Sequence, residues 1–146
     1  MPEHARTVLG FDYGERRIGV AVGHCETGLA NPLTTVTNPG DETDWPALMQ
    51  LIRDWRPDAL VVGIPTHMDG KATAMTRRAS RFCDELATRS ALPTHPADER
   101  ASSRAAEHIL KSNRQQGRRR AKRGDTDKVA AALILQQWME SHDGDC

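Results

Sequence analysis

Three acidic positions, far apart in the sequence, have the residue types and surroundings of a metal site. Asp12 ends an apolar run, the acidic pair Asp98 and Glu99 follows a proline-rich segment, and Asp127 stands at the start of an apolar helical stripe. An ionised carboxylate among apolar residues is costly to desolvate unless a cation meets it. Carboxylate oxygens are also the ligands that Mg²⁺ and Mn²⁺ prefer. A divalent-metal site is therefore expected if the fold brings these positions together.

Each of these acids also has a structural explanation. Asp12 begins Asp-Tyr-Gly-Glu, which is favourable turn chemistry. Asp127 would complement the helix dipole if it lies in the first turn of its helix. Residues 98–100, Asp-Glu-Arg, have the composition of an ordinary charged surface. If the three carboxylates do converge without a cation, they should repel one another.

The apolar patterns predict an α/β fold with a five-stranded mixed sheet and helices on both faces. Strands are expected over residues 7–13, 18–24, 33–37 and 59–64, with a weaker fifth strand over 92–97. Helices are expected over residues 45–55, 73–88, 103–110 and 126–140. The first two strands should pair antiparallel, the later ones parallel, and the tryptophans at 45 and 55 should lie in the core.

In such sheets, ligands collect at the carboxyl ends of the strands. Asp12 ends the first strand, residues 66–70 follow the fourth, and residues 98–100 follow the fifth, so three loops should converge on one rim. The last helix has an apolar stripe that recurs every three or four residues and includes Asp127, which should therefore face inward. The other members of the stripe are Ala130, Ala131, Ile134, Leu135 and Trp138.

Basic residues are concentrated in one segment of about residues 111–124, although the net charge of the chain is zero. Seven cations lie there with no acid among them, which leaves 13 basic against 20 acidic residues elsewhere. This polarity predicts a nucleic-acid contact; a solvated, flexible loop is the alternative. The seven are Lys111, Arg114, Arg118, Arg119, Arg120, Lys122 and Arg123.

The length of 146 residues is most simply explained by one domain, residues 1–146. The longest apolar runs, 59–64 and 129–135, are too short to span a membrane, and no signal peptide is evident at the N-terminus. We therefore expect a cytoplasmic protein with no membrane partner. Cys25, Cys83 and Cys146 are odd in number and widely separated, which predicts reduced thiols.

Five motifs, in order along the chain, resemble the YqgF (RuvX) family, described as pre-16S rRNA nucleases related to Holliday-junction resolvases. The motifs are residues 11–14, residues 18–23, residues 63–65 with 68–70, residues 98–100 with Ser103, and residues 127–131. The resemblance spans nearly the whole chain and implies a ribonuclease H-like fold. It also implies that Asp12, Glu99 and Asp127 form a catalytic, metal-binding triad for phosphodiester hydrolysis with one or two Mg²⁺ or Mn²⁺ ions.

Two departures from the family pattern affect the site. Ala97 and its proline-rich approach replace a more typical strand, which leaves open whether Asp98 or Glu99 faces the metal, and Glu99 is preferred. Lys128 replaces a small hydroxyl residue after Asp127 and has the reach to contact a phosphate.

Several further residues are candidates to hold a nucleic-acid backbone, and two glycines to permit its close approach. The candidates are Arg100, Ser103, Arg118, Arg119, Arg120, Lys122, Arg123 and Lys128, with Gly14 and Gly70. The family resemblance implies precursor rRNA as the substrate, whereas the composition does not separate RNA from DNA. The alternatives are a Holliday-junction resolvase acting on branched DNA, a phosphate-binding kinase or ATPase, and a non-catalytic RNA-binding assembly factor. Junction resolution would require a dimer, but the sequence shows no dimer seam, and a monomer or weak dimer is expected.

Overall fold

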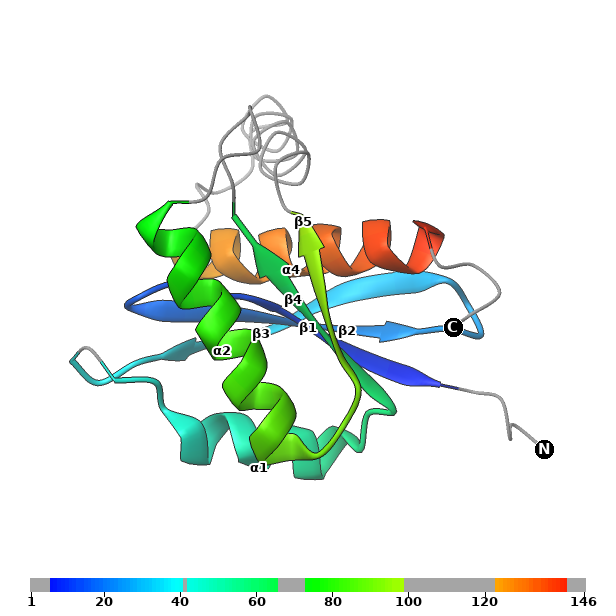
Figure 1. The fold of residues 1–146 in the computed structure, drawn as a ribbon. Helices are drawn as coiled ribbons and strands as arrows, with labels where there is room; N and C mark the ends of the chain where they lie inside the picture. Colours follow the sequence, from blue (N-terminus) through cyan, green and yellow to red (C-terminus); the bar gives the residue numbers. More distant parts are fainter. Residues whose placement is uncertain (1–5, 41, 66–72, 99–122, 142–146) are drawn as a thin grey trace.

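The computed structural model describes residues 6–40, 42–65, 73–98 and 123–141 (Figure 1). Its strands are β1 (Thr7–Asp12), β2 (Arg17–His24), β3 (Leu29–Thr37), β4 (Ala59–Ile64) and β5 (Thr94–Asp98). Its helices are α1 (Trp45–Trp55), α2 (Ala74–Ser90) and α4 (Arg123–Ser141). None of the helices in these ranges is both long and apolar enough to cross a membrane. The helix expected over 103–110 lies outside the described residues.

The five strands form one mixed sheet in the order β3-β2-β1-β4-β5. β1 pairs antiparallel with β2, and β2 with β3, whereas β4 lies parallel to both β1 and β5. Helices α1 and α2 cover one face and α4 covers the other (Figure 1). The predicted mixed sheet with helices on both faces is confirmed.

Two apolar cores fill the space between the sheet and its helices, and each strand contributes to them alternately. Leu9 and Phe11 of β1 pack with Leu48 of α1 and Phe82 of α2. Val8 of β1 packs with α4 on the other face. β4 is buried on both faces, as its continuous apolar sequence predicts.

Helix α4 packs closely on β2 because two glycines there leave room for it. A Cβ atom on Gly19 would overlap the carbonyl oxygen of Asp127, and one on Gly23 would lie 2.6 Å from Sδ of Met139. The two glycines are four residues apart on one face of the strand. They therefore set the direction of α4, whose N-terminal part lies over Gly19.

Of the two edge strands, β5 agrees with the prediction and β3 is longer than predicted. The weak fifth strand is confirmed, and its Pro96 is tolerated because β5 is an edge strand. β3, the other edge, begins at Leu29, four residues before the prediction. The added residues pair with the end of β2. Gln136 of α4 also binds there: its Oε1 accepts from the Ala30 amide at 2.8 Å, and its Nε2 donates to the Gly28 carbonyl at 2.7 Å.

Two other predictions were wrong in part. Trp45 packs against the core as expected, but Trp55 is 38% exposed at the end of α1.

The cysteines were predicted to be reduced. Cys83 is a buried free thiol whose pKa is raised by burial and by neighbouring Asp84. Cys25 is disulfide-bonded rather than reduced. An odd number of cysteines does not reveal which of them the fold brings close together.

Candidate active site

Asp12 is the last residue of β1 and lies between two glycines on the neighbouring strands. It is paired with Gly19 of β2 on one side and Gly63 of β4 on the other. Directly paired residues of an antiparallel pair share a face of the sheet. Because a side chain at Gly19 would point at α4, half-buried Asp12 lies on the α4 face, with a glycine at each directly paired position.

Asp127 is held on the same face by its helix. Its carbonyl oxygen lies over Gly19, the residue paired with Asp12. Its side chain is 25% exposed, so the prediction that Asp127 faces inward is confirmed. α4 begins at Arg123, three residues before the predicted start, which makes Asp127 the fifth residue of the helix. The helix-dipole explanation weakens accordingly, because that effect falls off after the first turn.

Asp12 and Asp127 therefore meet at one end of the sheet, although they are 115 residues apart in the sequence. Gly19 is the link: it pairs with Asp12 in the plane of the sheet and contacts Asp127 above it. This end is the carboxyl edge of the parallel strands β1, β4 and β5, as predicted from the strand order. Two of the three predicted acidic positions are thus brought together by described residues.

The third acidic position is reached through β5. Gly63 pairs with Asp12 and also with Ala97, so one row of paired residues runs across four strands at this edge. Ala97 packs against the α4-face core. β5 ends at Asp98, and Glu99 lies outside the described residues. The topology therefore brings the backbone that precedes Glu99 to the edge occupied by Asp12.

Arg17 is a site residue that sequence reasoning missed. Its Nε donates to Oδ2 of Asp127 at 2.8 Å, and its side chain is 31% exposed. Asp127 therefore has a cationic partner even without metal, which the argument from carboxylate repulsion did not include. A signal did exist, since Arg17 lies two residues before Gly19 on β2 and the period of a strand places both on one face.

The other predicted site residues divide into two groups. Gly14 is explained by its turn, because a Cβ there would lie 2.5 Å from the carbonyl oxygen of Arg17. Lys128 is half-buried beside Asp127, and Arg123 begins α4. The remainder lie outside the described residues: Glu99, Arg100 and Ser103, Gly70, and Arg118, Arg119, Arg120 and Lys122.

The described carboxylates suit a hard divalent cation, whose preferred ligands are carboxylate oxygens. Within the described ranges, no group of three or more histidine, cysteine, aspartate or glutamate side chains is placed to hold a metal. A site with three carboxylates would thus need a ligand from beyond these ranges. Glu99, the ligand predicted from the sequence, lies beyond them.

Comparison with known families shows to which family the chain belongs. The sequence model of the RuvX family, described as a Holliday junction resolvase, matches residues 6–141. The chain belongs to the RuvX family. The resemblance found in the five motifs is confirmed.

Curated relatives of this RuvX chain carry the name "Putative pre-16S rRNA nuclease". One from Dechloromonas aromatica is 47% identical over 136 residues, covering 92% of this chain and 91% of the relative. One from Pseudomonas putida is 42% identical over 140 residues, covering 94% and 96%. The similarity thus extends over nearly the full length of both chains.

Holliday-junction resolvases are among the solved structures with a similar fold. Thermus thermophilus RuvC in complex with Holliday junction substrate has a TM-score of 0.60 at 17% identity, covering 95% of this RuvX chain and 96% of that one. The fowlpox virus Holliday junction resolvase has a TM-score of 0.54 at 12% identity, covering 92% and 99%. At these identities the likeness concerns the fold, which is ribonuclease H-like.

Proposed function

We propose that this RuvX chain is a divalent-metal-dependent endonuclease that hydrolyses phosphodiester bonds in precursor 16S rRNA. The observation that carries the proposal is the meeting of Asp12 and Asp127, through Gly19, at the carboxyl edge of the sheet. The names of the curated relatives support rRNA as the substrate. The cytoplasmic location expected from the sequence is part of the same proposal.

Glu99, rather than Asp98, is proposed as the third carboxylate. Ala97 packs on the α4 face, the face that also carries Asp12. Side chains of an extended segment alternate between faces, so the α4 face recurs two positions after Ala97, at 99. The register of β5 therefore favours Glu99.

Asp12, Glu99 and Asp127 would hold Mg²⁺ or Mn²⁺. When bound, such an ion activates water and stabilises charge on the leaving oxygen of the phosphodiester. Arg17 orients Asp127 by holding its Oδ2. In the described part of the chain Oδ1 of Asp127 has no partner, which leaves that oxygen for a cation.

The proposed substrate contacts are cations of α4 and of the basic segment. Lys128 follows Asp127 on α4, and Arg123 begins that helix. Arg100, Ser103, Arg118, Arg119, Arg120 and Lys122 are proposed from the sequence to bind phosphate groups, with Gly70 allowing close approach. Backbone contacts of this kind position a nucleic acid without reading its sequence.

The test compares wild type with Asp12→Asn on structured precursor rRNA and on a four-way DNA junction, in Mg²⁺, Mn²⁺ and EDTA. Wild type should cleave the RNA with either metal and not in EDTA, and Asp12→Asn should be inactive. Equal cleavage by Asp12→Asn would contradict the proposed site, and cleavage in EDTA would contradict the metal dependence.

A second candidate function is Holliday-junction resolution, which the description of the matching family favours. Symmetric cleavage of a junction needs two active sites and therefore a dimer. Preference for the DNA junction in the same assay, together with a dimer in sedimentation, would establish this alternative over rRNA cleavage.

A further inference from the structure

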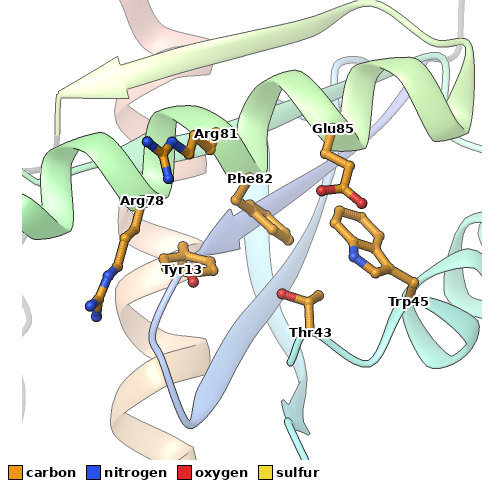
Figure 2. A pocket seen from close by; sticks show the side chains of 7 residues that line it. All are labelled: Tyr13, Thr43, Trp45, Arg78, Arg81, Phe82 and Glu85. Carbon is orange, nitrogen blue, oxygen red and sulfur yellow. The ribbon is translucent and has the colours of Figure 1, made fainter. Parts of the chain in front are cut away.

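A pocket of about 150 Å³ lies beside the end of β1, on the face of the sheet that α1 and α2 cover. This face is opposite to the one that carries Asp127. Figure 2 shows the lining side chains, which come from three parts of the chain. They are Tyr13 after β1, Thr43 before α1, Trp45 at the start of α1, and Arg78, Arg81, Phe82 and Glu85 of α2.

Aromatic rings form one wall of the pocket. Phe82 is 3% exposed and lies between Tyr13 and Trp45, with ring-centre distances of 5.0 and 5.4 Å (Figure 2). The Arg89 guanidinium lies 4.6 Å from the centre of the Trp45 ring. Trp45 is thus packed against two neighbours, whereas half-buried Tyr13 offers ring surface to an incoming group.

The charges around the pocket leave one cation uncompensated. Arg78 forms an ion pair with Glu15, and Glu85 accepts a hydrogen bond from Arg89 at 2.7 Å. Arg81 is exposed and forms no ion pair with any residue that the structure describes. An accessible aromatic surface therefore lies beside an available guanidinium group.

A nucleotide has the complementary pair of features, a planar ring and an anionic phosphate. Bases stack on tyrosine, and arginine binds phosphate through charge-assisted hydrogen bonds. The base must be unpaired, since the ring faces of a base within a duplex are covered by its stacked neighbours. We propose that the pocket binds one unpaired nucleotide of a nucleic-acid strand, with the base against Tyr13 and the phosphate on Arg81.

The inference rests on the proposed function, because it takes the strand to be the substrate of the nuclease site. Tyr13 directly follows Asp12, and the two lie on opposite faces at the same edge of the sheet. A strand that crosses this edge can therefore occupy both sites. Substrates with an unpaired nucleotide next to the cleaved bond would be selected over continuous duplexes.

The experiment measures binding separately from cleavage. Fluorescence anisotropy with the Asp12→Asn protein in EDTA compares a short single-stranded RNA, a DNA strand of the same sequence and a blunt RNA duplex. Tyr13→Leu, which keeps an apolar contact with Phe82, and Arg81→Gln are added to this background. The matched control is Arg77→Gln, which removes an exposed cation from the same helix but does not line the pocket.

Tyr13→Leu and Arg81→Gln should each weaken single-strand binding about tenfold, with little change for the duplex. Comparison of the RNA and DNA strands tells which backbone the pocket accepts. The inference is overturned if both variants bind like Arg77→Gln, if the duplex is weakened equally, or if the parent protein binds no single strand. Arg81 is exposed, so Arg81→Gln decides the matter even if Tyr13→Leu unfolds in a melting curve.

The same variants, with Asp12 restored, are assayed on precursor rRNA so that the two proposals can fail separately. Cleavage by wild type together with unchanged binding by the pocket variants would overturn the pocket and leave the nuclease function standing. Absence of cleavage by wild type, together with the tenfold weaker binding of the variants, would overturn the nuclease function and support a single-strand binding site.

Discussion

Arg17 Nε donates a 2.8 Å hydrogen bond to Asp127 Oδ2, joining the start of β2 to α4 across 110 residues of sequence. Both side chains are less than one third exposed. Asp127 therefore has a cationic partner before any metal binds. This relationship changes what removal of the Asp127 charge should do to stability.

Asp127→Asn should lower the free energy of unfolding in EDTA by about 1 kcal/mol or less, a fall in Tm of about 2–4 °C. The loss of the ion pair with Arg17 is the reason, and it reverses the sign expected from carboxylate repulsion alone. In Mg²⁺ the difference should widen, because wild type gains metal-binding free energy that the mutant lacks.

Melting curves in EDTA and in Mg²⁺ measure both effects. Glu85→Gln is the control, since it breaks an exposed i,i+4 ion pair with Arg89 and should leave Tm nearly unchanged. A mutant as stable as wild type in EDTA would mean that the Arg17 pair contributes nothing. An equal difference in the two buffers would mean that Asp127 does not bind the metal.

Gly19→Ala should destabilise the protein by about 2–3 kcal/mol, because the added methyl group overlaps the backbone of α4. It should also reduce cleavage, since Asp127 is carried on the displaced helix. Urea denaturation measures the loss of stability. Gly40→Ala is the control: its Cβ meets nothing within 4 Å, and its φ of +60° should cost about 1 kcal/mol. Equal costs would argue against close packing of α4 on β2.

Glu99→Gln should abolish metal-dependent cleavage, whereas Asp98→Asn should retain much of it. The alternation that places Ala97 on the α4 face is the physical reason. Cleavage of precursor rRNA in Mg²⁺ is the measurement, with Tm as the check on folding. The reverse result would mean that the strand register near residue 98 is shifted by one residue and that Asp98 is the site residue.

Replacement of Arg118, Arg119 and Arg120 by glutamine should weaken nucleic-acid binding and flatten its salt dependence. The slope of log K against log salt should fall by about 0.7–0.9 for each phosphate group that the variant no longer neutralises. Binding titrations at several salt concentrations give this slope, and Arg53→Gln, an exposed change on α1, is the control. An unchanged slope would identify the basic segment as a solvated loop.

Much of the fold could be predicted because the local patterns agree with their surroundings. The continuous apolar run of β4 requires burial on both faces, and the stripe that contains Asp127 requires a helix packed on the sheet. Asp12 could be placed at a strand end for the same reason. These features depend on the residues within one element.

The features that were missed depend on contacts between distant elements. The start of β3, which pairs with β2, is also held by hydrogen bonds of Gln136 to Ala30 and Gly28, more than 100 residues away in sequence. The alternation of β2 places Arg17 on the α4 face, but its partner Asp127 is determined by where α4 lies over Gly19. Strand and helix periodicity indicate which face a residue occupies, and they do not identify what covers that face.

Because α4 packs on β1 and β2, the fold can be completed only after α4 has been synthesised. The glycine-rich face of the first two strands is covered by the last described helix, and the Arg17–Asp127 pair spans 110 residues. Translation adds about 5–20 residues per second, so α4 would be synthesised about 5–20 s after this face of the sheet. Until then the nascent sheet is covered on one side and lacks the carboxylate that α4 contributes. Catalytic competence would therefore be acquired late in synthesis, together with the closure of the second core.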